Sequence, residues 1–193
     1  MPILSKDDQY KLRKLLRCNA TTDYLHDVYN QPLFISKLKS AIKMLKAFHK
    51  SNTFDAIAFC GHSGAAFAFP ISFALNIPAI CVRKRGELTN SHCDRVFEGI
   101  RPKKYIIIDD RICDGNTIKR IVNEINAEID AYNEDLKWQR RYNIKNIMKH
   151  PELLAIFLYS DIDPYRYVHN GIPVFHVDYG EKERRLVSKS KKI

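Results

Sequence analysis

The sequence predicts an α/β fold in which a largely parallel β-sheet forms the core and helices flank it. Short apolar runs, typical of strands that are buried on both faces, alternate along the chain with longer segments of helical periodicity. That alternation favours a parallel sheet with right-handed crossover connections. At 193 residues the chain is expected to form a single domain. The expected strands are 56–60, 78–82, 105–108, 153–159 and 172–177.

The helices are predicted from capping signals and from the spacing of apolar residues. Ser5 and Asp8 resemble a capping box and begin an amphipathic helix that continues to residue 16. A second helix begins near Ser36. A third is expected over 65–75, where Pro70 predicts an irregularity. The fourth expected helix is 116–132, and 88–99 is expected to be a polar loop.

Composition restricts the class of protein. A hydrophobic content of 45% is sufficient for a core, and no apolar run approaches the ~20 residues that cross a bilayer. The first residues lack the apolar centre of a secretory signal. The cysteines are odd in number and lack C-x-x-C pairing, so we expect reduced thiols and a cytoplasmic protein without a membrane partner. The cysteines are Cys18, Cys60, Cys81, Cys93 and Cys113.

A net charge of +10 indicates an anionic partner, such as a nucleotide, a pyrophosphate compound or a nucleic acid. Part of the excess lies in the tail, 188–193, and part in a segment with interleaved cations and aromatics, 137–142. This segment allows contact with RNA or DNA by charge and stacking. The favoured interpretation is an exposed helical face on which Trp138 or Tyr142 turns inward.

The most informative segment runs from residue 105 to residue 117. An apolar, β-branched strand ends in the acidic pair Asp109 and Asp110, and a short turn with Gly115 and Thr117 leads into a helix. Carboxylates accept hydrogen bonds from vicinal hydroxyls. The N-terminus of a helix favours an anion. The order of these features predicts a ligand that carries both sugar hydroxyls and a phosphate.

Two further loops are expected at the same edge of the sheet. Residues 61–64, with His62, Ser63 and Gly64, are expected to form a tight turn that presents backbone N–H groups and a hydroxyl to an anion. Arg83, Lys84 and Arg85 place three cations where the next strand ends. Together with the acidic motif, these loops predict a pocket for a sugar with phosphates at both ends.

The chain resembles the type I phosphoribosyltransferases, and within that family most closely the adenine-specific enzymes. The resemblance covers about 54–123, with a weaker echo over 171–180. The segment 80–88 is similar to the second strand and following loop of the family. The acidic motif is similar to the family's signature for phosphoribosyl pyrophosphate, PRPP.

The resemblance implies roles for the motif residues. Asp109 and Asp110 face the ribose hydroxyls and, with Arg83, act in catalysis. Mg²⁺ on the diphosphate is the implied cofactor, which these two acids hold indirectly. The implied substrate-binding residues are His62, Ser63, Gly64, Lys84, Arg85, Arg111, Cys113, Asp114, Gly115, Asn116 and Thr117.

The resemblance also implies an organisation and an activity. Residues 54–160 form the PRPP-binding core, 1–53 and 161–193 form a small hood that selects the base, and 133–151 is a basic insertion. The implied enzyme is a pentosyltransferase of nucleotide salvage. It transfers ribose 5-phosphate from PRPP to a nucleobase-like acceptor and releases pyrophosphate. The resemblance further suggests a homodimer.

Three positions depart from the family pattern. Arg111 replaces an apolar residue, Cys113 replaces an acid, and Asp114 replaces a small residue that helps to hold phosphate. A carboxylate beside a phosphate is unfavourable, so either Arg111 offsets Asp114 or the Asp114 side chain points outward and caps the helix. These departures leave a second function open. In this alternative, a catalytically degenerate protein senses a nucleotide or PRPP and acts through a nucleic-acid or protein partner, by way of the basic insertion and tail.

Overall fold

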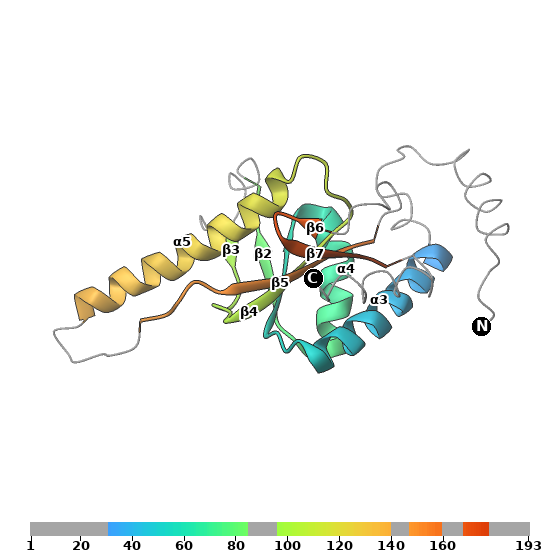
Figure 1. Ribbon diagram of the computed structural model, residues 1–193, viewed down its shortest axis with the longest axis horizontal. Coiled ribbons are helices and arrows are strands. Elements are labelled where there is room, and N and C mark those ends of the chain that lie inside the picture. Colours follow the sequence, from blue (N-terminus) through green and yellow to red (C-terminus); the bar gives the residue numbers. More distant parts are fainter. Residues whose placement is uncertain (1–30, 85–95, 140–146, 160–167, 178–193) are drawn as a thin grey trace.

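The computed structural model describes residues 31–84, 96–139, 147–159 and 168–177, which form a seven-stranded sheet flanked by helices (Figure 1). The helices are α3 (Gln31–Ser51), α4 (Gly61–Leu75) and α5 (Asn116–Gln139). The strands are β1 (Ala56–Cys60), β2 (Ala79–Val82), β3 (Phe97–Glu98), β4 (Lys104–Asp109), β5 (Glu152–Leu158), β6 (Val168–His169) and β7 (Ile172–His176).

The strands follow the order β3-β2-β1-β4-β5-β7-β6. The five central strands pair in parallel, whereas β3 and β6 add at the two edges in antiparallel orientation. All five expected strands are therefore present in a mostly parallel sheet, and the predicted fold class is confirmed. The two short antiparallel edge strands were not predicted.

Alternation of side chains along the strands divides the core into two layers. Ile57 and Phe59 of β1, with Ile106 and Ile108 of β4, belong to the cluster on the α3 and α4 face. The intervening residues of the same strands pack on the other face, with α5. The continuous apolar runs of the sequence thus reflect strands that are buried on both sides.

Aromatic contacts hold the α3 and α4 layer to the sheet. Phe48 of α3 meets Phe157 of β5 edge to face, with 5.3 Å between ring centroids. Phe67 of α4 stacks on Tyr159 at 4.0 Å. The amine of Lys37 donates a hydrogen bond of 3.1 Å to the Tyr159 carbonyl, so α3 also contacts the end of β5.

The boundaries of the helices differ from the expectations in informative ways. Helix α3 begins at Gln31, α4 continues through Pro70, and α5 extends to Gln139 because Leu136 prolongs its buried stripe. The expectation of a separate turn at 61–64 is wrong, since these residues form the first turn of α4. The expected helix at 5–16 lies outside the described residues.

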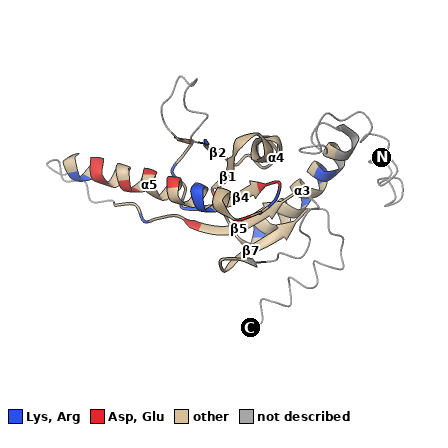
Figure 2. Cartoon of the chain, turned by 90° about the horizontal axis from the view of Figure 1, so that it is seen from above, with Lys and Arg blue, Asp and Glu red and all other residues tan. Residues whose placement is uncertain are grey.

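The predicted insertion 133–151 has five Lys or Arg residues against two Asp or Glu residues in the sequence, and the structure describes only 133–139 and 147–151 of it. Its first residues continue α5, whose outer half projects beyond the sheet (Figure 1) and carries acidic side chains (Figure 2). Trp138 is 82% exposed, so it does not turn inward. Residues 1–30, 140–146, 160–167 and 178–193 lie outside the described residues. Within the predicted hood segments, α3 packs against the sheet, and β6 and β7 belong to it. A nucleic-acid contact and base selection by a hood stay predictions.

Cys60 is buried, Cys81 is half-buried and Cys113 is exposed. Among the described helices, none has both the length and the apolar character that a membrane span requires.

Asn133 joins the projecting part of α5 to the segment that enters β5. Its side chain donates to the Met148 carbonyl and accepts from the Met148 N–H, both at 2.9 Å, and it is only 8% exposed. Asn133→Ala leaves two backbone groups of Met148 without these bonds, so we expect a loss of about 1–3 kcal/mol in the free energy of unfolding in urea. Asn123→Ala, at an exposed position of the same helix, is the control. Equal stability of the two variants would contradict the bridging role.

Candidate functional site

The site lies at the point where the topology of the sheet reverses. Strands β1 and β4 are neighbours, but α4 leads from β1 to β2 on one side and α5 leads from β4 toward β5 on the other. The connections at the carboxyl ends of β1 and β4 therefore diverge, and this is where open α/β sheets bind ligands.

Helix α4 begins immediately after β1. Gly61 has a φ of +67°, which turns the chain from strand to helix without a loop, and no side chain caps the N-terminus at Cys60. A Cβ on Gly64 would lie 2.8 Å from the Phe59 Cβ and 3.1 Å from the Ile108 carbonyl oxygen. The absence of a side chain at Gly64 therefore permits the first turn of α4, with its uncapped N–H groups, to lie close to the end of β4.

This close approach brings Ser63 to the acidic pair. The Ser63 hydroxyl donates to Asp109 Oδ1 at 3.4 Å, and the Asp110 N–H donates to the same oxygen at 2.9 Å. The Tyr159 hydroxyl donates to the Ser63 carbonyl at 2.7 Å, which fixes the turn from the opposite side. Asp109 is 3% exposed and Asp110 is 9% exposed, so both carboxyls are held inside the protein.

The pKa of Asp109 is raised, and burial is the main cause. Burial first, and then the nearby charge and side chain of Asp110, together raise the pKa of Asp109 from 3.8 to about 8, against the lowering effect of the hydrogen bonds from the Asp110 N–H and Ser63. At neutral pH the Asp109 carboxyl is therefore largely protonated in the unliganded protein. Perturbed carboxyls of this kind concentrate at functional sites.

The loop between β4 and α5 forms the other end of the site. Asp114 accepts a hydrogen bond of 2.9 Å from the N–H of Asn116, the first residue of α5. Gly115 has a φ of +79°, and a Cβ there would lie 2.5 Å from the ring of His169. The position requires glycine both for its backbone conformation and for the packing of His169 from the β6–β7 hairpin.

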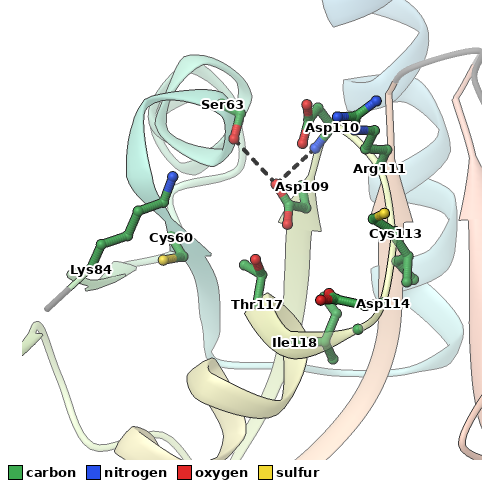
Figure 3. Close-up of a pocket in the computed structure, with 12 residues that line it drawn as sticks. Cys60, Ser63, Lys84, Asp109, Asp110, Arg111, Cys113, Asp114, Thr117 and Ile118 are labelled. Carbon is green, nitrogen blue, oxygen red and sulfur yellow. Dashed lines mark hydrogen bonds between the residues drawn. The ribbon is translucent and has the colours of Figure 1, made fainter.

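A pocket of about 110 Å³ opens between these elements. Lys84 extends from the end of β2 toward the first turn of α4, where its amine lies against Gly61 (Figure 3). Thr117 points from the start of α5 toward Asp109 (Figure 3). The volume suits one end of a small polar ligand. The lining residues are Cys60, Ser63, Lys84, Asp109, Asp110, Arg111, Ile112, Cys113, Asp114, Gly115, Thr117 and Ile118.

Most of the predicted site residues come together in this pocket, and their roles stay predictions. His62, Gly64 and Asn116 lie in the same turns without lining it. Arg83 does not line the pocket; its guanidinium pairs with Glu98 on β3. Arg85 lies outside the described residues.

Sequence reasoning missed Cys60, Ile112 and Ile118 in the lining, and His169 behind Gly115. A usable signal for His169 was present, because Asn170 and Gly171 form a two-residue turn with positive φ, and Asn-Gly between apolar residues is a strong hairpin signal. Recognising that hairpin would have placed His169 at the end of a strand beside the site.

The donor set at the site suits a hard divalent cation held mainly by ligand oxygens. Within the described ranges, no three His, Cys, Asp or Glu side chains cluster as metal ligands. The paired carboxyls of Asp109 and Asp110 at the pocket are compatible with Mg²⁺, which keeps several waters and takes few protein ligands when it binds to substrate phosphates.

Comparison of the sequence with known proteins gives partial matches, although no family model matches the chain. The chain is 27% identical over 92 residues to an adenine phosphoribosyltransferase of Butyrivibrio fibrisolvens, which covers 39% of this chain and 51% of the relative. It is 30% identical over 108 residues to the adenine phosphoribosyltransferase of Ureaplasma parvum, covering 48% and 62%. The matched part thus spans between half and two thirds of these relatives.

Comparison of the fold covers more of the chain. A phosphoribosyltransferase from Corynebacterium diphtheriae aligns with 86% of this chain and 92% of its own length, with a TM-score of 0.55 and 15% identity. Other structures with a TM-score of at least 0.50 include an orotate phosphoribosyltransferase of Francisella tularensis and an adenine phosphoribosyltransferase. The chain therefore has the fold of the type I phosphoribosyltransferases, as its sequence predicted.

The raised pKa of Asp109 makes stability depend on pH. Between pH 3.8 and about 8 the folded protein keeps a proton on Asp109 that the unfolded chain has released. The contribution of Asp109 to stability is therefore fully present below this window and is lost as the pH rises through it. We expect Asp109→Asn to gain stability relative to wild type between pH 5 and pH 8.5, by a difference on the order of a few kcal/mol in urea unfolding.

Asp135→Asn is the matched control, since Asp135 is exposed on α5. Its difference from wild type is expected to stay nearly constant between the two pH values. A constant difference for Asp109→Asn as well would contradict the assignment of a buried, protonated carboxyl.

Proposed function

We propose that this chain, which has the type I phosphoribosyltransferase fold and resembles adenine phosphoribosyltransferases over part of its length, transfers ribose 5-phosphate from PRPP to a nucleobase-like acceptor and releases pyrophosphate. The observation that carries the proposal is the acidic pair Asp109 and Asp110. It is buried at one pocket between the uncapped start of α4 and the loop before α5. Sugar hydroxyls and anionic groups are the complementary ligand chemistry.

The acidic pair is suited to a ribose diol. A protonated Asp109 has a donor as well as acceptor capacity, and Asp110 beside it lines the same pocket, so the pair can both accept from and donate to vicinal hydroxyls. Transfer of the ribosyl group develops positive charge on the sugar. Carboxyl groups that are already fixed beside the ring stabilise this charge without reorganisation.

The diphosphate is assigned to the α4 end of the pocket. The first turn of α4 has no side-chain cap, Ser63 adds a hydroxyl, and the Lys84 amine lies against Gly61. Donors and a cation in this position stabilise the negative charge that builds on departing pyrophosphate. Arg83 is paired with Glu98, so it must leave this partner before it can bind the diphosphate.

Mg²⁺ fits the proposal as a metal held mainly by the diphosphate, with Asp109 and Asp110 contributing through water. When bound, it neutralises phosphate charge and polarises the leaving group. The protein's own contribution is to orient the sugar and to keep the buried carboxyls in place.

The same pocket also serves the alternative function, in which the chain binds PRPP or a nucleotide as a signal without catalysis. The acidic pair supports both functions, so only an assay of turnover distinguishes the enzyme from the sensor. A nucleobase acceptor, a homodimer and a role for the hood in base selection belong to the proposal as expectations from the relatives.

The direct test is incubation with PRPP, Mg²⁺ and a panel of purine, pyrimidine and nicotinamide-type bases, with pyrophosphate release as the measurement. We expect release that depends on one class of base and falls roughly 100-fold in Asp110→Asn, because the charge beside the developing cation is lost. Asp135→Asn is expected to keep wild-type activity.

PRPP binding by calorimetry accompanies the assay. Binding without base-dependent release would replace the enzyme with the sensor. Absence of both binding and release, or equal affinity of wild type and Asp110→Asn, would contradict the proposed site.

A further inference from the structure

We infer that Asp114 determines which anions this pocket accepts, because its carboxylate occupies the backbone N–H at the start of α5 that a ligand phosphate would otherwise bind. A dianionic phosphate that takes this N–H must displace the Asp114 side chain. The inference rests on the proposed function, since it concerns the phosphate end of the same pocket, and it adds a residue that weakens phosphate binding there.

The geometry of the loop supports an internal anion. Asp114 Oδ1 accepts from the Asn116 N–H at 2.9 Å, and Oδ2 accepts from the Asn116 side chain. Asn116 is the first residue of a helix of 24 residues, so its N–H is among the donors that the helix leaves without an internal partner. The side chain of Asp114 thus holds one donor that an incoming phosphate oxygen would need.

The charge of Asp114 persists at neutral pH. The hydrogen bond from the Asn116 N–H lowers the pKa of Asp114, and the group is exposed. A phosphate at the loop would therefore meet a full negative charge as well as an occupied donor.

The cations that line the pocket lie away from Asp114. Lys84 lies against Gly61 at the start of α4, and Arg111 lies apart from Asp114, at the Asp110 end of the loop (Figure 3). The charge of Lys84 thus lies toward the proposed diphosphate end, and the charge of Asp114 lies at the proposed phosphate end. We expect the pocket to hold a ligand mainly by its diphosphate.

Two substitutions separate the charge of Asp114 from its capping role. Asparagine keeps an acceptor for the Asn116 N–H and removes the charge, whereas alanine removes both. If Asp114 served only as a structural cap, Asp114→Asn would change little and Asp114→Ala would lower stability without improving affinity for any anion.

The experiment measures the affinity of wild type, Asp114→Asn and Asp114→Ala for ribose 5-phosphate and for pyrophosphate by calorimetry. We expect both variants to bind ribose 5-phosphate about tenfold more tightly than wild type. Affinity for pyrophosphate is expected to stay within about twofold, because this anion is assigned to the other end of the pocket. In thermal unfolding, the Tm of Asp114→Ala is expected to fall by about 2–4 °C, while that of Asp114→Asn changes little.

Asp135→Asn removes the same charge from the outer half of α5 and is the matched control. Unchanged ribose 5-phosphate affinity in both Asp114 variants overturns the inference, and the turnover assay with PRPP then decides separately on the proposed function. An equal gain for ribose 5-phosphate and pyrophosphate, or an equal gain in the control, also overturns it, because the effect would then come from net charge and not from the loop. Tighter ribose 5-phosphate binding together with a less stable Asp114→Ala supports it.

Discussion

The close approach of the first turn of α4 to the end of β4 is the constraint on which the site depends. It requires Gly64, whose missing side chain leaves room for the Phe59 side chain and the Ile108 carbonyl. It places the Ser63 hydroxyl within reach of Asp109, and the Tyr159 hydroxyl holds the same turn through the Ser63 carbonyl. The contact thus places the start of α4, which Cys60 does not cap, beside the buried Asp109 carboxyl.

That arrangement gives the pocket two ends of different character. Burial beside Asp110 raises the pKa of Asp109, so the protein loses stability as the pH rises and Asp109 ionises. Functional sites often retain such local costs in stability. At one end the start of α4 and Lys84 favour anions, and at the other Asp114 already occupies the start of α5. The pocket therefore combines a buried acidic pair with a loop that itself carries negative charge.

Much of the fold was predictable because burial on both faces leaves a direct record in the sequence. The apolar runs of β1 and β4 are such records. The acidic pair after residue 108 marks the carboxyl end of β4 in the same way. Features set by tertiary contacts were not predictable. The pairing of Arg83 with Glu98 depends on the two-residue strand β3. The start of α4 at residue 61 depends on the positive φ of Gly61, whereas the sequence pattern predicted a separate turn over 61–64.

We propose that the acidic pair and the two flanking turns form one binding site for a phosphorylated pentose. The most direct measurement is a titration of the ¹⁵N-labelled protein with PRPP and Mg²⁺, in which backbone amide shifts are followed by NMR. The account predicts the largest changes at Ser63, Asp110, Gly115 and Thr117, with little change at Trp138 on the outer half of α5. Changes confined to the outer half of α5, or none at the four pocket residues, would contradict it.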